Sequence, residues 1–278
     1  MTSDIFASQP ADEDLLAELY DLEHDDVLED QAFYRELSRR MPGPVLDLGC
    51  GSGRLFRALL AGGATRVVGI DGSAALLRRA EARIASDAGL RDARAAERIS
   101  LVRGDVRALA TLNIRERFSL AIAVGVVPHL DGPEDALRLL GGARSLLGPG
   151  GRLVLDDLGP GAMPDRDLPL SVDWHRTLNG REVVRRSELI RRESPEGLRV
   201  AFSTIADAVQ PDGTIARLPA SHRLWYPSPE ALAELVAQAG MVVEESYGSH
   251  DLEPLDRESG RRVFLVVYVP GAVPEHER

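Results

Sequence analysis

A glycine-rich turn between a strand and a helix constrains this chain more than any other feature of its sequence. The apolar run at residues 45–48 leads into Gly-Cys-Gly-Ser-Gly at 49–53, and Arg54 and Leu55 then begin a helical pattern. Because glycine has no Cβ atom, the backbone of such a turn can approach a ligand closely, and free N–H groups at the helix start favour a carboxylate or phosphate. The segment therefore predicts a ligand-binding turn. Cys50, the only cysteine, is expected to fill a small space there without thiol chemistry.

The spacing of these glycines argues against the dinucleotide-binding pattern G-x-G-x-x-G. Counted from Gly49, the third glycine would fall on Arg54, and counted from Gly51 it would fall on Phe56. The observed pattern is instead D-x-G-x-G-x-G, which begins at Asp47. A nicotinamide-dependent dehydrogenase is therefore disfavoured, and a titration with NADH would test it.

Strands and helices are expected to alternate around this turn. Short apolar runs predict five strands, and helical patterns follow most of them, one beginning at Ser73 as its N-cap. Such alternation is typical of a mostly parallel sheet with helices on both faces. The expected strands are 45–48, 66–70, 99–103, 118–124 and 152–156.

The regular alternation stops after residue 157. Prolines and alternating stretches at 182–190 and 199–209, with a turn at 210–213, predict antiparallel strands. A helix is then expected at 229–239 and two strands at 241–247 and 263–269. The predicted domains are an acidic helical cap (1–44), a core (45–157), a β-rich lid insertion (158–222) and the C-terminal part of the core (223–278).

Four segments in order resemble the class I S-adenosylmethionine (SAM)-dependent methyltransferases. They are DLGCGSG at 47–53, GIDGSAALL at 69–77, GDV at 104–106 and LGPGG at 147–151. The resemblance covers residues 45–157 well and 223–269 more loosely. It implies a Rossmann-like, seven-stranded, mostly parallel sheet, with the β-rich insertion after strand five.

The resemblance also implies a SAM site at the ends of the first four strands. The glycine turn would pass under the methionine part of SAM, and Asp71 would accept both ribose hydroxyls. Asp105 with the Val106 N–H would hold the adenine edge, Leu76 would pack on its face, and Val124 would lie near the sulfonium. The alternative is that Asp71 and Asp105 are ordinary capping or turn acids. The expected cofactor-binding residues are Asp47, Gly49, Gly51, Gly53, Asp71, Gly72, Leu76, Asp105, Val106 and Val124.

The methyl acceptor is expected to be a small molecule. The stretch 124–129 lacks the Asn/Asp-Pro-Pro-aromatic motif of DNA amino methylases. The arrangement is closer to the glycine, sarcosine and amino-sugar N-methyltransferases, so an amine nitrogen is favoured over oxygen or carbon. A SAM-binding module without catalysis is the alternative from another class. Tyr34, Trp174, His175, Arg223 and Tyr226 are expected to bind the acceptor, although they could equally form local cores.

Two residues are candidates for the chemistry itself. His129 follows the fourth strand, where a nucleophile would arrive, and could act as a base, cap the next loop or contact the cofactor. Tyr20 could close over the sulfonium through its ring face or belong to a helix core.

Composition excludes several other functions. All 33 basic residues are arginine, so neither a phosphate-binding loop with its lysine nor Schiff-base chemistry is possible. A single cysteine excludes zinc sites built on several thiolates, and we expect no metal. No apolar run suits a signal peptide or a membrane span, so a cytoplasmic protein is expected. The exposed edges of a β-rich insertion would allow a homodimer.

The net charge of −11 is concentrated at the N-terminus. Residues 1–34 hold eleven acids and no arginine, which leaves 44 − 11 = 33 acids against 33 arginines in the rest. The balanced body gives no electrostatic case for binding nucleic acid. The acids, including Asp25, Asp26, Glu29 and Asp30, either favour a cationic acceptor or form a solvated tail.

Overall fold

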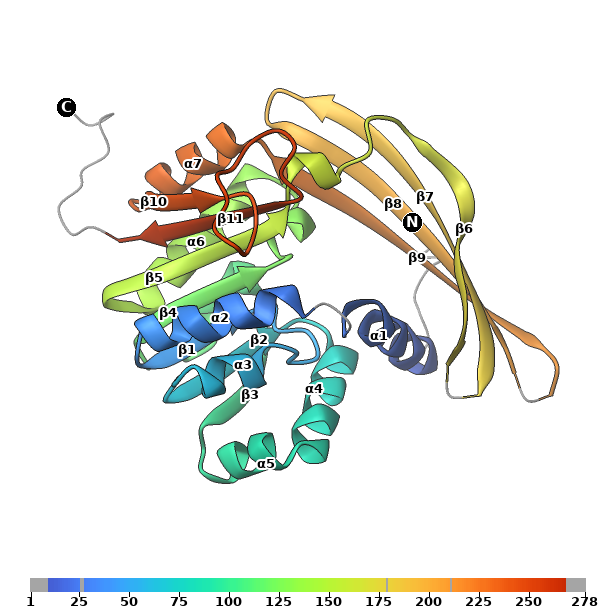
Figure 1. The fold of residues 1–278 in the computed structure, drawn as a ribbon, viewed down its shortest axis with the longest axis horizontal. Coiled ribbons are helices and arrows are strands. Elements are labelled where there is room, and N and C mark those ends of the chain that lie inside the picture. Colours follow the sequence, from blue (N-terminus) through green and yellow to red (C-terminus); the bar gives the residue numbers. More distant parts are fainter. Residues whose placement is uncertain (1–9, 26–27, 179, 211, 269–278) are drawn as a thin grey trace.

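The central feature of the fold is a seven-stranded sheet in the order β10-β11-β5-β4-β1-β2-β3 (Figure 1). The computed structural model describes residues 10–25, 28–178, 180–210 and 212–268. The first five strands run parallel, and β11 is antiparallel to both β5 and β10. The expected Rossmann-like sheet is confirmed. Its strands are β1 (Pro44–Leu48), β2 (Arg66–Asp71), β3 (Ile99–Arg103), β4 (Phe118–Val124), β5 (Leu147–Leu158), β10 (Val242–Tyr247) and β11 (Arg261–Val267).

Helices cover both faces of this sheet, as the continuous apolar runs of its strands require. Val45 belongs to a cluster with residues of α2, α3, α4 and α5, whereas Leu46 packs with residues of α6 and α7. None of the helices in the described residues is both long and apolar enough to cross a membrane. The helices are α1 (Pro10–His24), α2 (Glu29–Arg40), α3 (Phe56–Ala61), α4 (Ala74–Ser86), α5 (Ala88–Ala95), α6 (Pro133–Leu146) and α7 (Pro229–Gln238), with short 3₁₀ turns η1 (Val106–Thr111), η2 (Val127–His129) and η3 (Pro160–Ala162).

A second, four-stranded antiparallel sheet follows β5 and stands beside the first sheet (Figure 1). It consists of β6 (Leu168–Leu178), β7 (Arg181–Ser194), β8 (Gly197–Val209) and β9 (Ile215–Pro227). We call it the lid sheet. The expected turn at 210–213 joins β8 to β9, with Pro211 outside the described residues. The lid sheet continues to Pro227, beyond the expected boundary at 222.

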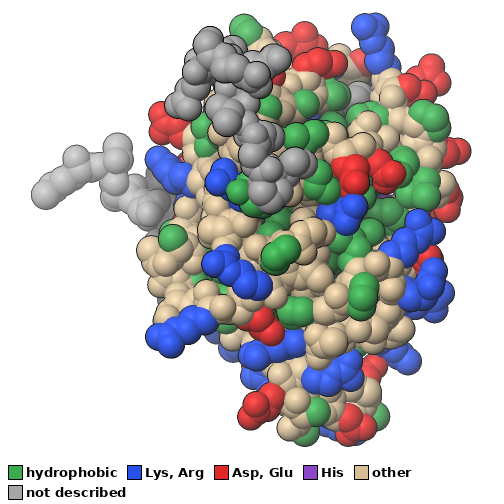
Figure 2. Space-filling model, turned by 90° about the vertical axis from the view of Figure 1, so that its left-hand side faces the viewer, with side chains coloured by type: hydrophobic (Ala, Val, Ile, Leu, Met, Phe, Trp, Pro, Cys, Tyr) green, Lys and Arg blue, Asp and Glu red, His purple; other side chains and the backbone are tan. Residues whose placement is uncertain are grey.

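The long helix α1 lies between α4 and the lid sheet (Figure 1). Its Leu19 packs on Val183, Ala206 and Leu218 of the lid. Figure 2 shows the opposite side of the molecule, on the left of Figure 1, where acidic and arginine side chains are interspersed with scattered apolar ones. Helix α1 lies away from this side, in the region where the two sheets face each other.

Candidate active site

A cavity of about 1000 Å³ lies between the carboxyl ends of the parallel strands, helix α1 and the lid sheet. Its lining includes Asp47 and Gly49 from the glycine turn, and Val124 and His129 after β4. The volume is at the upper end of the range for single-ligand pockets, so two ligands can share it. Its position at the carboxyl ends of β1, β2 and β4 is where open α/β sheets bind ligands.

The glycine turn bends back over the end of β2. The N–H groups of Gly49 and Cys50 both donate to the carbonyl of Ile70, at 2.8 and 2.9 Å. Gly51 has a φ of +54°, and a Cβ atom there would lie 3.1 Å from the Tyr20 hydroxyl, so the turn closely approaches α1. A Cβ atom on Gly53 would lie 2.6 Å from the ring of Phe56. Gly49 lines the cavity, whereas Gly51 and Gly53 shape the turn behind it.

Asp71 ties this turn to the start of α4. Its Oδ2 accepts the Gly51 N–H and its Oδ1 accepts the Ser73 N–H, each at 2.8 Å. Because a carboxylate has about four lone-pair sites, each oxygen keeps one site for a further donor. Asp71 therefore keeps acceptor sites that suit two ribose hydroxyls, but it does not itself line the cavity, so its expected contact with the ribose stays a prediction. Gly72 and Leu76 line the cavity next to it, and Ser73 caps α4 as expected.

Asp47 is almost fully buried at the end of β1 and borders the cavity. Burial raises the pKa of its carboxyl to about 7, the nearby Arg54 opposes this shift and Asp71 adds to it. A ligand cation beside Asp47 would favour its ionised form. The group thus fits the ammonium of the methionine part of SAM.

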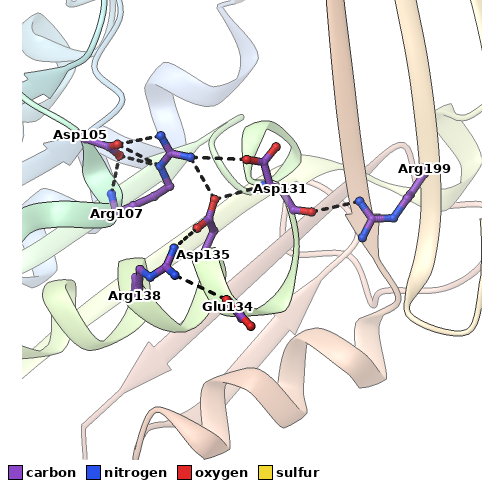
Figure 3. A network of polar contacts seen from close by, with 7 residues as sticks. All are labelled: Asp105, Arg107, Asp131, Glu134, Asp135, Arg138 and Arg199. Atoms are coloured by element: carbon purple, nitrogen blue, oxygen red, sulfur yellow. Dashed lines mark hydrogen bonds and ion pairs between the residues drawn. The ribbon is translucent and has the colours of Figure 1, made fainter.

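Asp105 belongs to a network of charged residues beside the cavity (Figure 3). Its carboxylate accepts the Arg107 backbone N–H at 2.8 Å and the Arg107 guanidinium at 2.8–3.0 Å, and these bonds lower the pKa of Asp105. Arg107 also contacts Asp135 at 3.1 Å. Neither Asp105 nor Val106 lines the cavity, so their expected contact with adenine stays a prediction.

The same network reaches the lid. Arg199 of β8 donates to the backbone carbonyl of Asp131 at 3.1 Å, and Asp131 lies 3.7 Å from Arg107 (Figure 3). The loop before α6 therefore connects the expected adenine side of the cavity with the lid sheet.

Two histidines from different parts of the chain meet in the cavity. The rings of His129 on η2 and His222 on β9 are edge-to-face, with centroids 5.9 Å apart. Surrounding protein lowers the pKa of His129, His222 lowers it further, and Asp71 opposes the shift. Burial and then Arg185 lower the pKa of His222. Both imidazoles are therefore held in the neutral form near pH 7, although both remain accessible from the open cavity.

The two expected tyrosines have different environments. Tyr20 lines the cavity, stacks on His24 at 4.1 Å and has its pKa raised to about 12, mainly by burial. Tyr34 is fully buried in the core, where its hydroxyl donates to Asp156 at 2.7 Å. The expectation that Tyr34 binds the acceptor is not supported, because Tyr34 does not line the cavity.

Side chains along a lid strand alternate between the two faces of the sheet, so only some of the expected lid residues face the cavity. Tyr226 lines the cavity as expected, but Arg223 does not, since it lies on the opposite parity of β9. Trp174 packs near Leu19 at the far edge of the lid, and His175 pairs with Glu182 at 2.5 Å. Neither lines the cavity, so these three expectations are not supported.

Several cavity-lining residues of the lid were not expected from the sequence. His222 and Leu224 share the parity of Tyr226 on β9, and Phe202 is paired in register with His222. The strand period gives the facing of these residues only once Trp225 is known to pack into the core, because the residues on either side of it then face the other way.

The N-terminal acids are largely engaged in ion pairs. Asp21 contacts Arg79 at 2.6 Å, Asp25 contacts Arg83 at 2.6 Å, and Glu23 contacts Arg185 of the lid at 2.5 Å. Asp30 is buried and binds Arg54 through two bonds of 2.5 and 2.7 Å. These acids therefore attach α1 and α2 and are not a solvated tail. Asp4 and Asp26 lie outside the described residues.

Comparisons with known proteins agree with this geometry. A family profile described as a methyltransferase domain matches residues 45–151. No curated protein sequence matches the chain.

Solved structures show the same fold. A SAM-dependent methyltransferase from Clostridium acetobutylicum is 16% identical, with a TM-score of 0.70 and coverage of 91% of this chain and 98% of that chain. DesVI from Streptomyces venezuelae is 20% identical, with a TM-score of 0.68 and the same coverage. The sugar N-methyltransferase KedS8 from Streptoalloteichus is 20% identical, with a TM-score of 0.65 and coverage of 88% and 92%.

Proposed function

We propose that this chain transfers a methyl group from SAM to an amine nitrogen of a small molecule, because residues 45–151 match the profile of a methyltransferase domain. The observation that supports this most is the convergence of the glycine turn, the Asp71 region and His129 on one cavity. Several solved structures of the same fold are described as sugar or glycopeptide N-methyltransferases, which is consistent with nitrogen as the acceptor atom.

Two carboxylates suit the ribose and the ammonium group of SAM. Asp71 keeps acceptor sites for the ribose hydroxyls, and Asp47 offers a carboxylate to the ammonium group. Bound SAM would supply a methyl group already activated by its sulfonium, so the protein has mainly to hold an acceptor in line and exclude water. Tyr20, which lies over the glycine turn, is placed to close that end of the cavity.

His129 supplies the proton chemistry that an amine needs. An amine arrives at neutral pH as an ammonium ion and has no lone pair until it loses a proton. The neutral imidazole of His129 would accept that proton, and the freed lone pair would take the methyl group of bound SAM as its bond to sulfur breaks, so S-adenosylhomocysteine leaves uncharged and the product is a methylated ammonium ion. Because His222 disfavours a charge on His129, the proton is held briefly and is released to solvent through the open cavity.

Calorimetry tests whether the protein binds SAM and whether Asp71 contributes to that binding. SAM and its demethylated product are titrated into wild type and the Asp71→Ala variant, with Asp256→Ala, on an exposed loop, as the matched control. We expect a loss of affinity in Asp71→Ala alone. Equal affinity in all three proteins, or none in wild type, would contradict the proposal.

Turnover tests the reaction. Mass spectrometry of a panel of amines and phenols incubated with SAM should show methylated amines. Tight SAM binding without any methylated product would instead favour a binding module, and methylated phenols alone would favour an O-methyltransferase.

A further inference from the structure

The side of the cavity that the lid sheet forms is mainly apolar, whereas the side formed by the ends of the parallel strands is polar. Alternating residues of three lid strands form one surface, with Leu189 on β7, Val200 and Phe202 on β8, and Leu224 on β9. Val200 pairs in register with Leu224, and Leu189 with Phe202, so these side chains lie next to one another on one face. The polar members of this surface are Thr204, His222 and Arg185; the Arg185 guanidinium, which binds Glu23 and Asp173, lies 5.6 Å from the centre of the Phe202 ring.

Residues that precede the lid sheet continue the apolar surface. Leu158 at the end of β5 lines the cavity and is 42% exposed, and Met163 also faces the cavity. A large apolar side chain that stays exposed inside a cavity is typical of a ligand contact. The acceptor end of the cavity therefore offers an apolar surface for the ligand to cover.

Most of the arginines that line the cavity are already paired with carboxylates. Three of the four arginines that line it hold carboxylates: Arg54 binds Asp30 at 2.5 Å, Arg185 binds Glu23 at 2.5 Å and also Asp173, and Arg261 binds Asp156. The fourth, Arg103, ends β3 next to Asp71 of β2 in the sheet register, on the side of the cavity where SAM is expected. A phosphate group needs cationic or N–H donors that are not already neutralised. The arginine on the lid side of the cavity, Arg185, is already neutralised by Glu23 and Asp173 and is therefore a poor phosphate ligand.

We infer that the acceptor amine is carried by an apolar, ring-containing body that packs on Leu189, Phe202 and Leu224, and not by a phosphate- or nucleotide-linked group. This inference rests on the proposed function, because it names the substrate class of the same site. His129 and His222 border the apolar surface, so an amine attached to a ring system would reach the imidazoles while its body covers the lid side chains.

Ligand binding to the full chain saturated with S-adenosylhomocysteine tests the inference. The two probes are 4-phenylbutylamine and a nucleoside diphosphate linked to an amino sugar, titrated by calorimetry. The arylalkylamine is expected to bind at least about tenfold more tightly, since burial of one aromatic ring supplies at least that factor. Tighter binding of the nucleotide-linked amine, or no binding of the arylalkylamine, would overturn the inference.

A pair of variants locates the contact. Phe202→Ala should weaken the arylalkylamine about tenfold. Leu170→Ala, a change at an exposed residue of β6 away from the cavity, should leave it unchanged. Unchanged affinity for S-adenosylhomocysteine in both variants reports intact folding, and its absence in wild type would instead contradict the proposed function. Equal effects of the two substitutions on the arylalkylamine would overturn the inference.

Discussion

The carboxyl group of Asp47 is ionised only in part at neutral pH, because burial raises its pKa to about 7. If the ammonium of SAM lies beside it, binding favours the ionised form and releases a proton. The affinity for SAM should therefore rise as the pH increases through about 7 and level off above it. Calorimetry in two buffers of different ionisation enthalpy measures the proton release directly.

The Asp47→Asn variant is the matched control for this prediction. It removes the titrating group at nearly constant volume, so its affinity should be lower and independent of pH between about pH 6 and pH 8. A wild-type affinity that does not vary over this range would show that Asp47 does not face the cation.

His222 is expected to set the pH at which His129 works. Protonated His129 cannot accept a proton, so kcat/KM falls as the pH drops through its lowered pKa. Replacing His222 with Gln removes one cause of that lowering, so the acidic limb of the profile should move to higher pH. Arg223→Gln, on the opposite parity of β9, is the control. An acidic limb at the same pH in His222→Gln and wild type would contradict the coupling of the two rings.

Single residues also show where sequence reasoning reaches its limit. The glycine turn and Ser73 were predictable, because local backbone and capping geometry are encoded within a few residues. Tyr34 was not, because its partner Asp156 is 122 residues away and only the fold brings the two together. The same applies to His129 and His222, since one lies on η2 after β4 and the other on β9 of the lid sheet.

At the scale of elements, the parallel strands were predictable to within one or two residues over β1 to β4, since β1, β2 and β4 are apolar runs that are largely buried on both faces and the partly exposed edge strand β3 is also a short apolar run. The lid strands were recognised as β-structure, but their faces were not assigned. Trp225 and Tyr226 are both large and apolar, so the pattern alone does not tell which of them faces the cavity.

Helix α1 packs on the lid through Leu19 and is joined to α4 by ion pairs, and these pairs make a salt effect predictable. Arg79 and Arg83 of α4 contact Asp21 of α1 and Asp25 just after it. Since α1 positions Tyr20 over the glycine turn, the Arg79→Ala/Arg83→Ala variant should lose affinity for SAM, by about fivefold if about 1 kcal/mol is lost. Wild-type affinity should also fall between about 50 mM and 500 mM salt, because salt screens exposed charges.

The control for this effect is Arg39→Ala, which removes an exposed pair with Glu36 inside α2. Its affinity for SAM and its salt dependence should match wild type. If the double variant also matches wild type, α1 does not contribute to the closure of the site.

At the scale of the whole molecule, a buried ion pair marks the junction between the lid and the core. Asp157 of β5 and Arg262 of β11 lie 3.7 Å apart and are almost fully buried. Arg262 also donates to the carbonyl of Pro227, where β9 leaves the lid. Within the described residues, neither carboxylate oxygen of Asp157 has a hydrogen-bond partner. Burial raises the pKa of Asp157 to about 7 and lowers the pKa of Arg262, so the pair is retained at a cost in desolvation.

Removal of one partner should therefore be far more harmful than removal of both. In Arg262→Met the pKa of Asp157 rises further, because the lowering effect of Arg262 is lost. The free energy of unfolding should then fall by about 3–5 kcal/mol at high pH, where a lone carboxylate would have to ionise. The loss should be smaller at about pH 5.5, where Asp157 is protonated. In Asp157→Asn/Arg262→Met neither charge of this pair remains, and stability should return close to that of wild type.

Denaturant unfolding of the single and double variants at the two pH values measures this coupling, with Arg223→Met on the exposed side of β9 as control. A double variant as unstable as Arg262→Met would show that the contact of Arg262 with Pro227, and not the buried charge, holds the lid to the core. A pH-independent loss in Arg262→Met would contradict the raised pKa of Asp157. The proposed acceptor surface lies on the lid sheet. A variant should therefore lose affinity for the acceptor only if its substitution weakens the attachment of the lid to the core.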